Sequence, residues 1–103
     1  MVRPLYAAAV ITIHVHSSKT GDGWECAVTV RGGTETHHRV HVSAGTLERL
    51  APGATDPDEL VRSSFAFLLD REPQSSILRE FELPVIGTYF PEYETAIRAR
   101  PGD

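Results

Sequence analysis

The sequence has one cysteine, Cys26, among its 103 residues. A single cysteine cannot form an internal disulfide bond, so the sequence excludes a disulfide framework and predicts folding that does not depend on an oxidising compartment. No apolar run approaches the roughly 20 residues that a membrane-spanning helix needs. Near the amino terminus, apolar and polar residues alternate, which is typical of a strand and not of a secretory signal. We therefore expect a cytoplasmic protein with no membrane association.

Positive charge is also scarce in the chain. Ten Lys and Arg residues stand against 14 Asp and Glu residues, and the formal net charge at pH 7 is −4. The basic residues are scattered singly, and residues 51–103 hold five of them against ten acidic residues. Because nucleic-acid binding needs a basic stripe that neutralises phosphates, this distribution disfavours nucleic acid as a partner.

The rest of the composition is that of a globular protein, with 41% hydrophobic and 23% charged residues. Compact domains usually contain about 100–150 residues. No internal repeat or linker divides the chain. We therefore expect one domain over residues 1–103, with poorly ordered ends at 1–8 and 99–103.

Three segments alternate between apolar and polar residues, at about 10–16, 24–31 and 35–42. They are rich in β-branched residues, and turn-forming residues separate them, with a polar loop expected at 17–23. This pattern predicts a three-stranded antiparallel β-meander with one apolar and one polar face.

The register of the second and third strands depends on the turn at the glycine pair between them. A two-residue turn would set the apolar residues of one strand against the polar residues of the next, so it is disfavoured. A three-residue turn at 31–33 would pair Glu25 with Arg39, whereas one at 32–34 would pair Glu25 with His41. Both remain open, and turn chemistry favours 31–33 because it places a glycine at the left-handed position.

A long helix is expected at about 57–71. The run Asp-Pro-Asp-Glu at 56–59 has a capping residue, a proline for the first helical position and an acid that reaches back. Apolar residues then follow at helical spacing, and Pro73 ends the pattern. The apolar residues at helical spacing are Leu60, Val61, Phe65, Leu68 and Leu69.

Proline divides the remaining chain into short elements. We expect short helices at about 76–81, 84–90 and 91–99. The predicted fold is therefore α+β, in which the antiparallel meander is packed on one face by the long helix and by short C-terminal helices.

Histidines on the polar face of the meander are candidate metal ligands. Strand phase places five candidates there, and pairing of His14 with Glu25 would bring several together. Imidazole and carboxylate groups are ligands for zinc and copper. The alternative is a solvated polar face without metal. The candidate ligands are His14, His16, Glu25, His37 and His41.

No set of residues indicates a catalytic nucleophile with its base. Cys26 falls in the apolar phase of its strand, where burial raises the pKa of a thiol and makes it unreactive. Only His38 shares that face, and no third group is placed to orient it. We therefore assign no catalytic residue and no cofactor other than the alternative zinc or copper.

A cluster of aromatic residues near the carboxyl terminus is a candidate protein-binding surface. Acidic residues flank these aromatic side chains, and Tyr and Phe in such a setting suit protein interfaces. The alternative is that they complete the core, which three strands and one helix cannot close alone. The candidates are Phe81, Tyr89, Phe90 and Tyr93.

Several segments resemble those of a group of small uncharacterised bacterial proteins, namely SFAFLLDREP at 64–73, SIL at 76–78 and YFPEY at 89–93. The run GATDPDEL at 53–60 is more loosely similar to the helix start in the N-terminal domain of HicB-type antitoxins. That family's C-terminal DNA-binding element is absent here. The antitoxin resemblance implies a partner-binding role without operator binding.

These observations together predict a small non-catalytic bacterial protein-interaction module, an antitoxin-like protein or an adaptor. Its expected partner is another protein, or a second copy that adds to the free edge of the sheet. The alternative is a histidine-lined metal-binding protein or enzyme that uses the polar face of the sheet.

Overall fold

The computed structural model describes residues 10–99. The expected disorder at 1–8 and 100–103 lies outside the described residues, whereas residue 99 ends a helix. The elements are β1 (Thr12–Thr20), β2 (Gly23–Gly32), β3 (Thr34–Ser43), α1 (Ala44–Leu50), α2 (Asp58–Leu69), a 3₁₀ turn (Gln74–Ser76), β4 (Glu80–Glu82), α3 (Val85–Tyr89) and α4 (Tyr93–Ala99). Within residues 10–99, every helix is too short or too polar to span a lipid bilayer.

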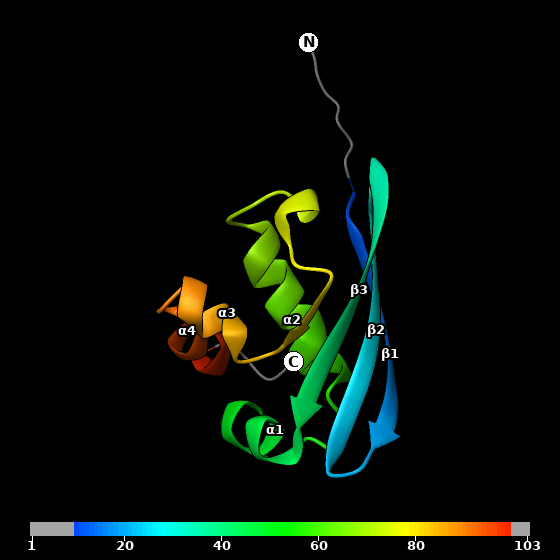
Figure 1. Cartoon of the computed structure of the whole chain (residues 1–103). Coiled ribbons are helices and arrows are strands. Elements are labelled where there is room, and N and C mark those ends of the chain that lie inside the picture. The colour runs from blue at the N-terminus through cyan, green and yellow to red at the C-terminus, as the bar shows by residue number, and fades with distance from the viewer. Residues whose placement is uncertain (1–9, 100–103) are drawn as a thin grey trace.

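The fold is α+β, as predicted, with a mixed sheet of strand order β1-β2-β3-β4. The helices lie on one side of the sheet, and α2 lies between the sheet and the α3–α4 pair (Figure 1). The expected meander is present, since β1, β2 and β3 pair antiparallel. The other face of the sheet carries the polar side chains of each strand.

The fourth strand corrects the expectation of a short helix at 76–81. After the 3₁₀ turn the chain is extended, and β4 pairs in parallel with β3, with Phe81 opposite Val40. Phe81 is 8% exposed and lies on the apolar face, between two exposed glutamates. Three residues are too few to show alternation in a sequence, so only the pairing with β3 reveals this strand.

The first connection is shorter than predicted, because β1 continues through the expected loop to Thr20. A two-residue turn at 21–22 then leads into β2. Ser17 is opposite Cys26 and Lys19 is opposite Trp24 on the apolar side, so the alternation continues with polar residues. An edge strand tolerates them there, and hydrophobicity alone therefore ends the predicted strand too early.

The register between β2 and β3 is the 32–34 alternative, and the favoured 31–33 turn is wrong. Gly33 stands alone at the apex with a φ of +86°, and Glu25 lies opposite His41. In this register Arg31 lies opposite Glu35, and their side chains form an ion pair with an N–O distance of 2.9 Å. Glu25 still reaches Arg39, a diagonal neighbour, at 3.0 Å.

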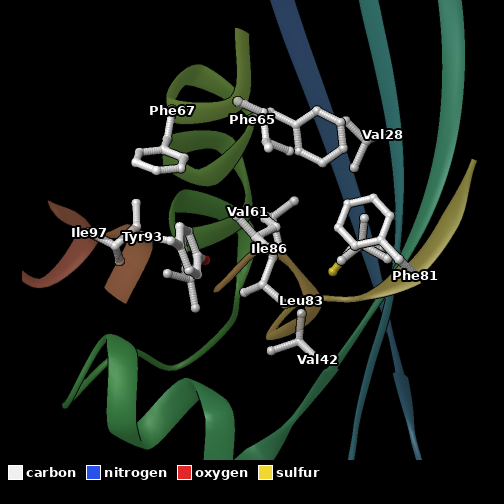
Figure 2. Close-up of a cluster of buried hydrophobic side chains, with 14 of the residues drawn as sticks. Val28, Val42, Val61, Phe65, Phe67, Phe81, Leu83, Ile86, Tyr93 and Ile97 are labelled. Carbon is white, nitrogen blue, oxygen red and sulfur yellow. The ribbon is translucent and has the colours of Figure 1, made fainter. Parts of the chain in front are cut away.

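The long helix begins at Asp58, with Pro57 as its cap residue, and ends at Leu69. Asp56 Oδ1 accepts a hydrogen bond from the Asp58 N–H at 3.0 Å, which supports the first turn. The helix buries two faces (Figure 2). Phe65 lies beside Val28 of the sheet, whereas Phe67 lies on the opposite side with Tyr93 and Ile97. The core therefore continues through α2, from the sheet to α4.

Candidate functional site

The five candidate metal ligands lie on the polar face of the sheet, but the register does not gather them. His14 is opposite Thr29 and His16 is opposite Ala27, so Ser18 is the residue that faces Glu25. Within residues 10–99, no three His, Cys, Asp or Glu side chains are close enough together to hold a metal ion. The pairing of His14 with Glu25, on which the metal hypothesis relied, is therefore absent.

Two of these histidines instead contact carboxylates, one at each end of β3. His37 Nε2 lies 2.8 Å from Glu35, and His41 Nε2 lies 2.7 Å from Glu80 on β4. The hydrogen bond from Arg31 lowers the pKa of the Glu35 carboxyl, and the hydrogen bond from His41 lowers that of Glu80. The polar face thus carries exposed polar contacts, among them a Glu35 carboxylate shared by Arg31 and His37, and exposed contacts of this kind contribute little to stability.

Cys26 lies in the core with no exposed surface. Its burial, with a smaller contribution from the negative charge of Asp58, raises the pKa of the thiol to about 12. The thiol therefore remains protonated at neutral pH and is a poor nucleophile.

The four aromatic candidates separate into two environments. Tyr93 has no exposed surface, and its hydroxyl lies 2.6 Å from Ser64 Oγ inside the core. Tyr89 is 65% exposed. Tyr89, Phe81 and Phe90 line a common pocket, which Tyr93 does not reach. Three of the four candidates are therefore brought together at one site.

This pocket has a volume of about 340 Å³ and lies beside the carboxyl-terminal end of α2. The segment that follows α2, from the 3₁₀ turn through β4 to α3, supplies the other walls. The lining of the pocket includes Leu68, Glu72, Ser76, Leu78, Phe81 and Tyr89. Leu78 is 47% exposed, so the pocket has exposed apolar side chains at its edge.

The wall that contains Leu78 is attached to the sheet by a buried histidine. His38 is 5% exposed, and its Nδ1 donates to the Leu78 carbonyl at 2.8 Å. In neutral imidazole the other nitrogen is then an acceptor, and Nε2 lies 3.0 Å from Thr36 Oγ1. The ring also packs edge-on against Phe65, with 5.2 Å between ring centroids. His38 therefore joins β3, α2 and the pocket wall.

Gln74, at the start of the 3₁₀ turn, makes a second attachment. Its Nε2 lies 3.2 Å from the carbonyls of Val30 and Thr34 and 3.1 Å from Thr36 Oγ1. Strand phase places His38 on the apolar face, but the sequence gives no signal for its bond to Leu78 or for the role of Gln74. Both contacts span about 40 residues of chain, beyond the reach of a local pattern.

The buried position of His38 predicts an acid-sensitive fold. Burial lowers the pKa of His38 below its ordinary value of 6.5, and the positive charge of Arg79 lowers the pKa further. The hydrogen bond to Leu78 raises the pKa but does not cancel the effect of burial. The unfolded chain then takes up a proton at higher pH than the folded chain. The stabilising contribution of neutral His38 is complete above pH 6.5 and is lost as pH falls through the lower, folded-state pKa.

Urea denaturation between pH 7.5 and 5 would measure this effect as a decrease in the free energy of unfolding. Glu35 and Glu80, which contact histidines, contribute little to the change over this pH range, since the pKa of each lies below the ordinary 4.5. In the His38→Gln variant, the free energy of unfolding should change less with pH than in the wild type. The same substitution at the exposed His16 should leave the pH dependence unchanged. An unchanged pH dependence in His38→Gln would contradict this assignment.

Comparison with protein-family models, with curated proteins and with solved structures found no match to this chain. The function of the chain must therefore be inferred from the pocket and its surroundings.

Proposed function

We propose that this chain is a small, non-catalytic protein-interaction module, an antitoxin-like protein or an adaptor, and that the pocket beside α2 binds a segment of another protein. The observation that carries this proposal is the exposure of Leu78 and Tyr89 at the edge of an apolar pocket. Exposed apolar side chains around a concave site are typical of interaction surfaces.

The size of the pocket supports a partner that contributes a few side chains. Pockets for small ligands usually have volumes of about 300–1,000 Å³, so 340 Å³ is at the lower end of that range. One or two large apolar side chains from a short amphipathic segment suit such a volume, as in recognition of a helix by a groove. Tyr89 offers a rigid ring with a polar tip, a common anchor in protein interfaces.

A Ser76→Trp substitution tests this proposal, because Ser76 is exposed and lines the pocket. An indole at this position should fill the pocket without disturbing the core. Peptides selected from a random display library on the wild-type chain are the probe, and fluorescence anisotropy measures their affinity. We expect Ser76→Trp to weaken binding by at least about tenfold, since losing one anchored side chain usually costs more than about 1 kcal/mol.

The matched control is Ser75→Trp, which adds the same ring at the exposed neighbouring residue, outside the pocket lining. This variant should bind the selected peptides within about twofold of wild type, because the pocket stays open. Equal binding by both variants and wild type would show that the peptides use another surface, and the proposal would be rejected.

The free edge of β1 offers a second place for association. β1 is at the end of the strand order, so the outer side of its nine residues has no neighbouring strand within residues 10–99. Self-association through this edge remains a prediction.

A further inference from the structure

The wall of the pocket includes one acidic side chain, that of Glu72, among mostly apolar neighbours. Glu72 follows α2 and is partly buried. No basic side chain within residues 10–99 forms an ion pair with it. A carboxylate that is partly removed from water and has no cationic partner favours a ligand that supplies one.

In the described part of the chain, the nearby arginines, Arg71 and Arg79, form no ion pair with Glu72. Arg71 Nε binds Glu92 at 3.0 Å, and its guanidinium lies 3.6 Å from the Phe67 ring centroid. Arg71 also donates to the Phe67 carbonyl at 3.1 Å, which fixes its direction. Arg79, the other arginine of this region, does not line the pocket.

The part of the chain that contains the pocket carries a net negative charge, the same sign as the Glu72 carboxylate. Residues 51–99 include nine acidic residues and four arginines, a net charge of 4 − 9 = −5. Such a field attracts cationic partners and increases their rate of association.

From Glu72 and this charge we infer that the partner segment is a cationic amphipathic peptide chain. A large apolar side chain enters between Leu78 and Tyr89, and a lysine or arginine close to it in the partner pairs with the Glu72 carboxylate. This inference rests on the proposed function, since it names the chemistry of the segment that the pocket binds.

The test uses the full chain and the peptides selected on it by display. We expect these peptides to combine a large apolar residue with Lys or Arg within one helical turn. Glu72→Gln keeps the shape of the side chain and removes its charge, so it should weaken their binding about five- to tenfold at low salt, as for a partly exposed ion pair. The same substitution should also make peptide binding less dependent on salt concentration, because one charge pair is lost.

The matched control is Glu82→Gln, which removes the same charge from an exposed residue of β4 outside the pocket lining. It should change affinity by less than about twofold, since an exposed charge outside the pocket lining is screened by solvent and salt. Thermal unfolding of both variants at the wild-type midpoint would show that each is folded.

The possible outcomes separate this inference from the proposed function. In one outcome, the selected peptides lose binding to the Ser76→Trp variant yet keep normal affinity for Glu72→Gln. That result would overturn the inference of a cationic partner and leave the proposed binding module intact. Failure to select any peptide that Ser76→Trp excludes would overturn both. A dimer detected by sedimentation and abolished by Ser76→Trp would assign the pocket to a second copy and overturn the inference.

Discussion

Replacing Tyr93 with alanine is expected to lower the free energy of unfolding by about 3–5 kcal/mol, the usual cost of truncating a buried aromatic residue. Tyr93 has no exposed surface, and its ring packs edge-on against Phe67 with 5.3 Å between centroids. It also joins α4 to α2 through the hydrogen bond to Ser64. Since domains of this size are stable by about 5–15 kcal/mol, the variant should lose a large part of its stability.

The matched control for this prediction is Tyr89→Ala, the same substitution four residues earlier. Tyr89 is 65% exposed, so its truncation should change stability by less than about 0.5 kcal/mol while weakening peptide binding. Guanidinium denaturation measures both effects on stability. Equal losses in the two variants would contradict the division of these tyrosines between core and surface.

A milder variant, Tyr93→Phe, separates the hydrogen bond from the packing. Ser64 Oγ donates to the Leu60 carbonyl at 2.8 Å, so its lone pair accepts from the Tyr93 hydroxyl. Burial raises the pKa of Tyr93 to about 12, which keeps that hydroxyl protonated as a donor. Removing the Tyr93 hydroxyl should lower the free energy of unfolding by about 1–2 kcal/mol, because the buried Ser64 oxygen loses its hydrogen-bond donor.

The second large effect is expected at Gly23, the first residue of β2. A Cβ at this position would lie 2.3 Å from the Val42 carbonyl oxygen and 2.9 Å from the Ser43 Cα. Both contacts are with backbone, so β2 and β3 must separate locally to admit a methyl group. We expect Gly23→Ala to lower the free energy of unfolding by about 3 kcal/mol, the upper part of the range for overpacked sites.

Gly21→Ala is the control for Gly23→Ala, since no atom lies within 4 Å of a Cβ at Gly21. This change in the turn should alter the free energy of unfolding by less than about 1 kcal/mol, and its sign should be neutral or stabilising. Thermal unfolding of the two variants measures the difference. A Gly23→Ala chain as stable as Gly21→Ala would show that the strands accommodate the methyl group without cost.

Much of the fold could be predicted because two periods are strong in the sequence. Alternation in the first half predicts the three antiparallel strands, and helical spacing after Pro57 predicts α2 to within about two residues at either end. The register of β2 and β3 required more information. The parity of the two strands alone allows two turns. The structure has the turn at 32–34, which pairs Arg31 with Glu35, although the preference for glycine at the left-handed position favours 31–33.

The candidate site could be predicted only as a cluster of aromatic residues. Tyr89 and Tyr93 are four residues apart, as if on one face of a helix, but Phe90 ends α3 and a separate helix begins at Tyr93. The helical period therefore cannot relate the orientations of the two tyrosines. β4 and the bonds of His38 and Gln74 depend on distant pairings, which the sequence pattern does not contain.

The parallel pairing of β4 also has a consequence for the order in which the structure can open. The hairpins of the meander join segments that are adjacent in the chain, whereas 40 residues separate His38 from Leu78. If the segment from the 3₁₀ turn to β4 detached from the sheet, both hairpins would keep their own pairing, so its release would be a sub-global opening and not complete unfolding. Because the pocket exists only while this segment is attached, a bound partner would stabilise the attached state and so link occupancy to the integrity of the sheet edge.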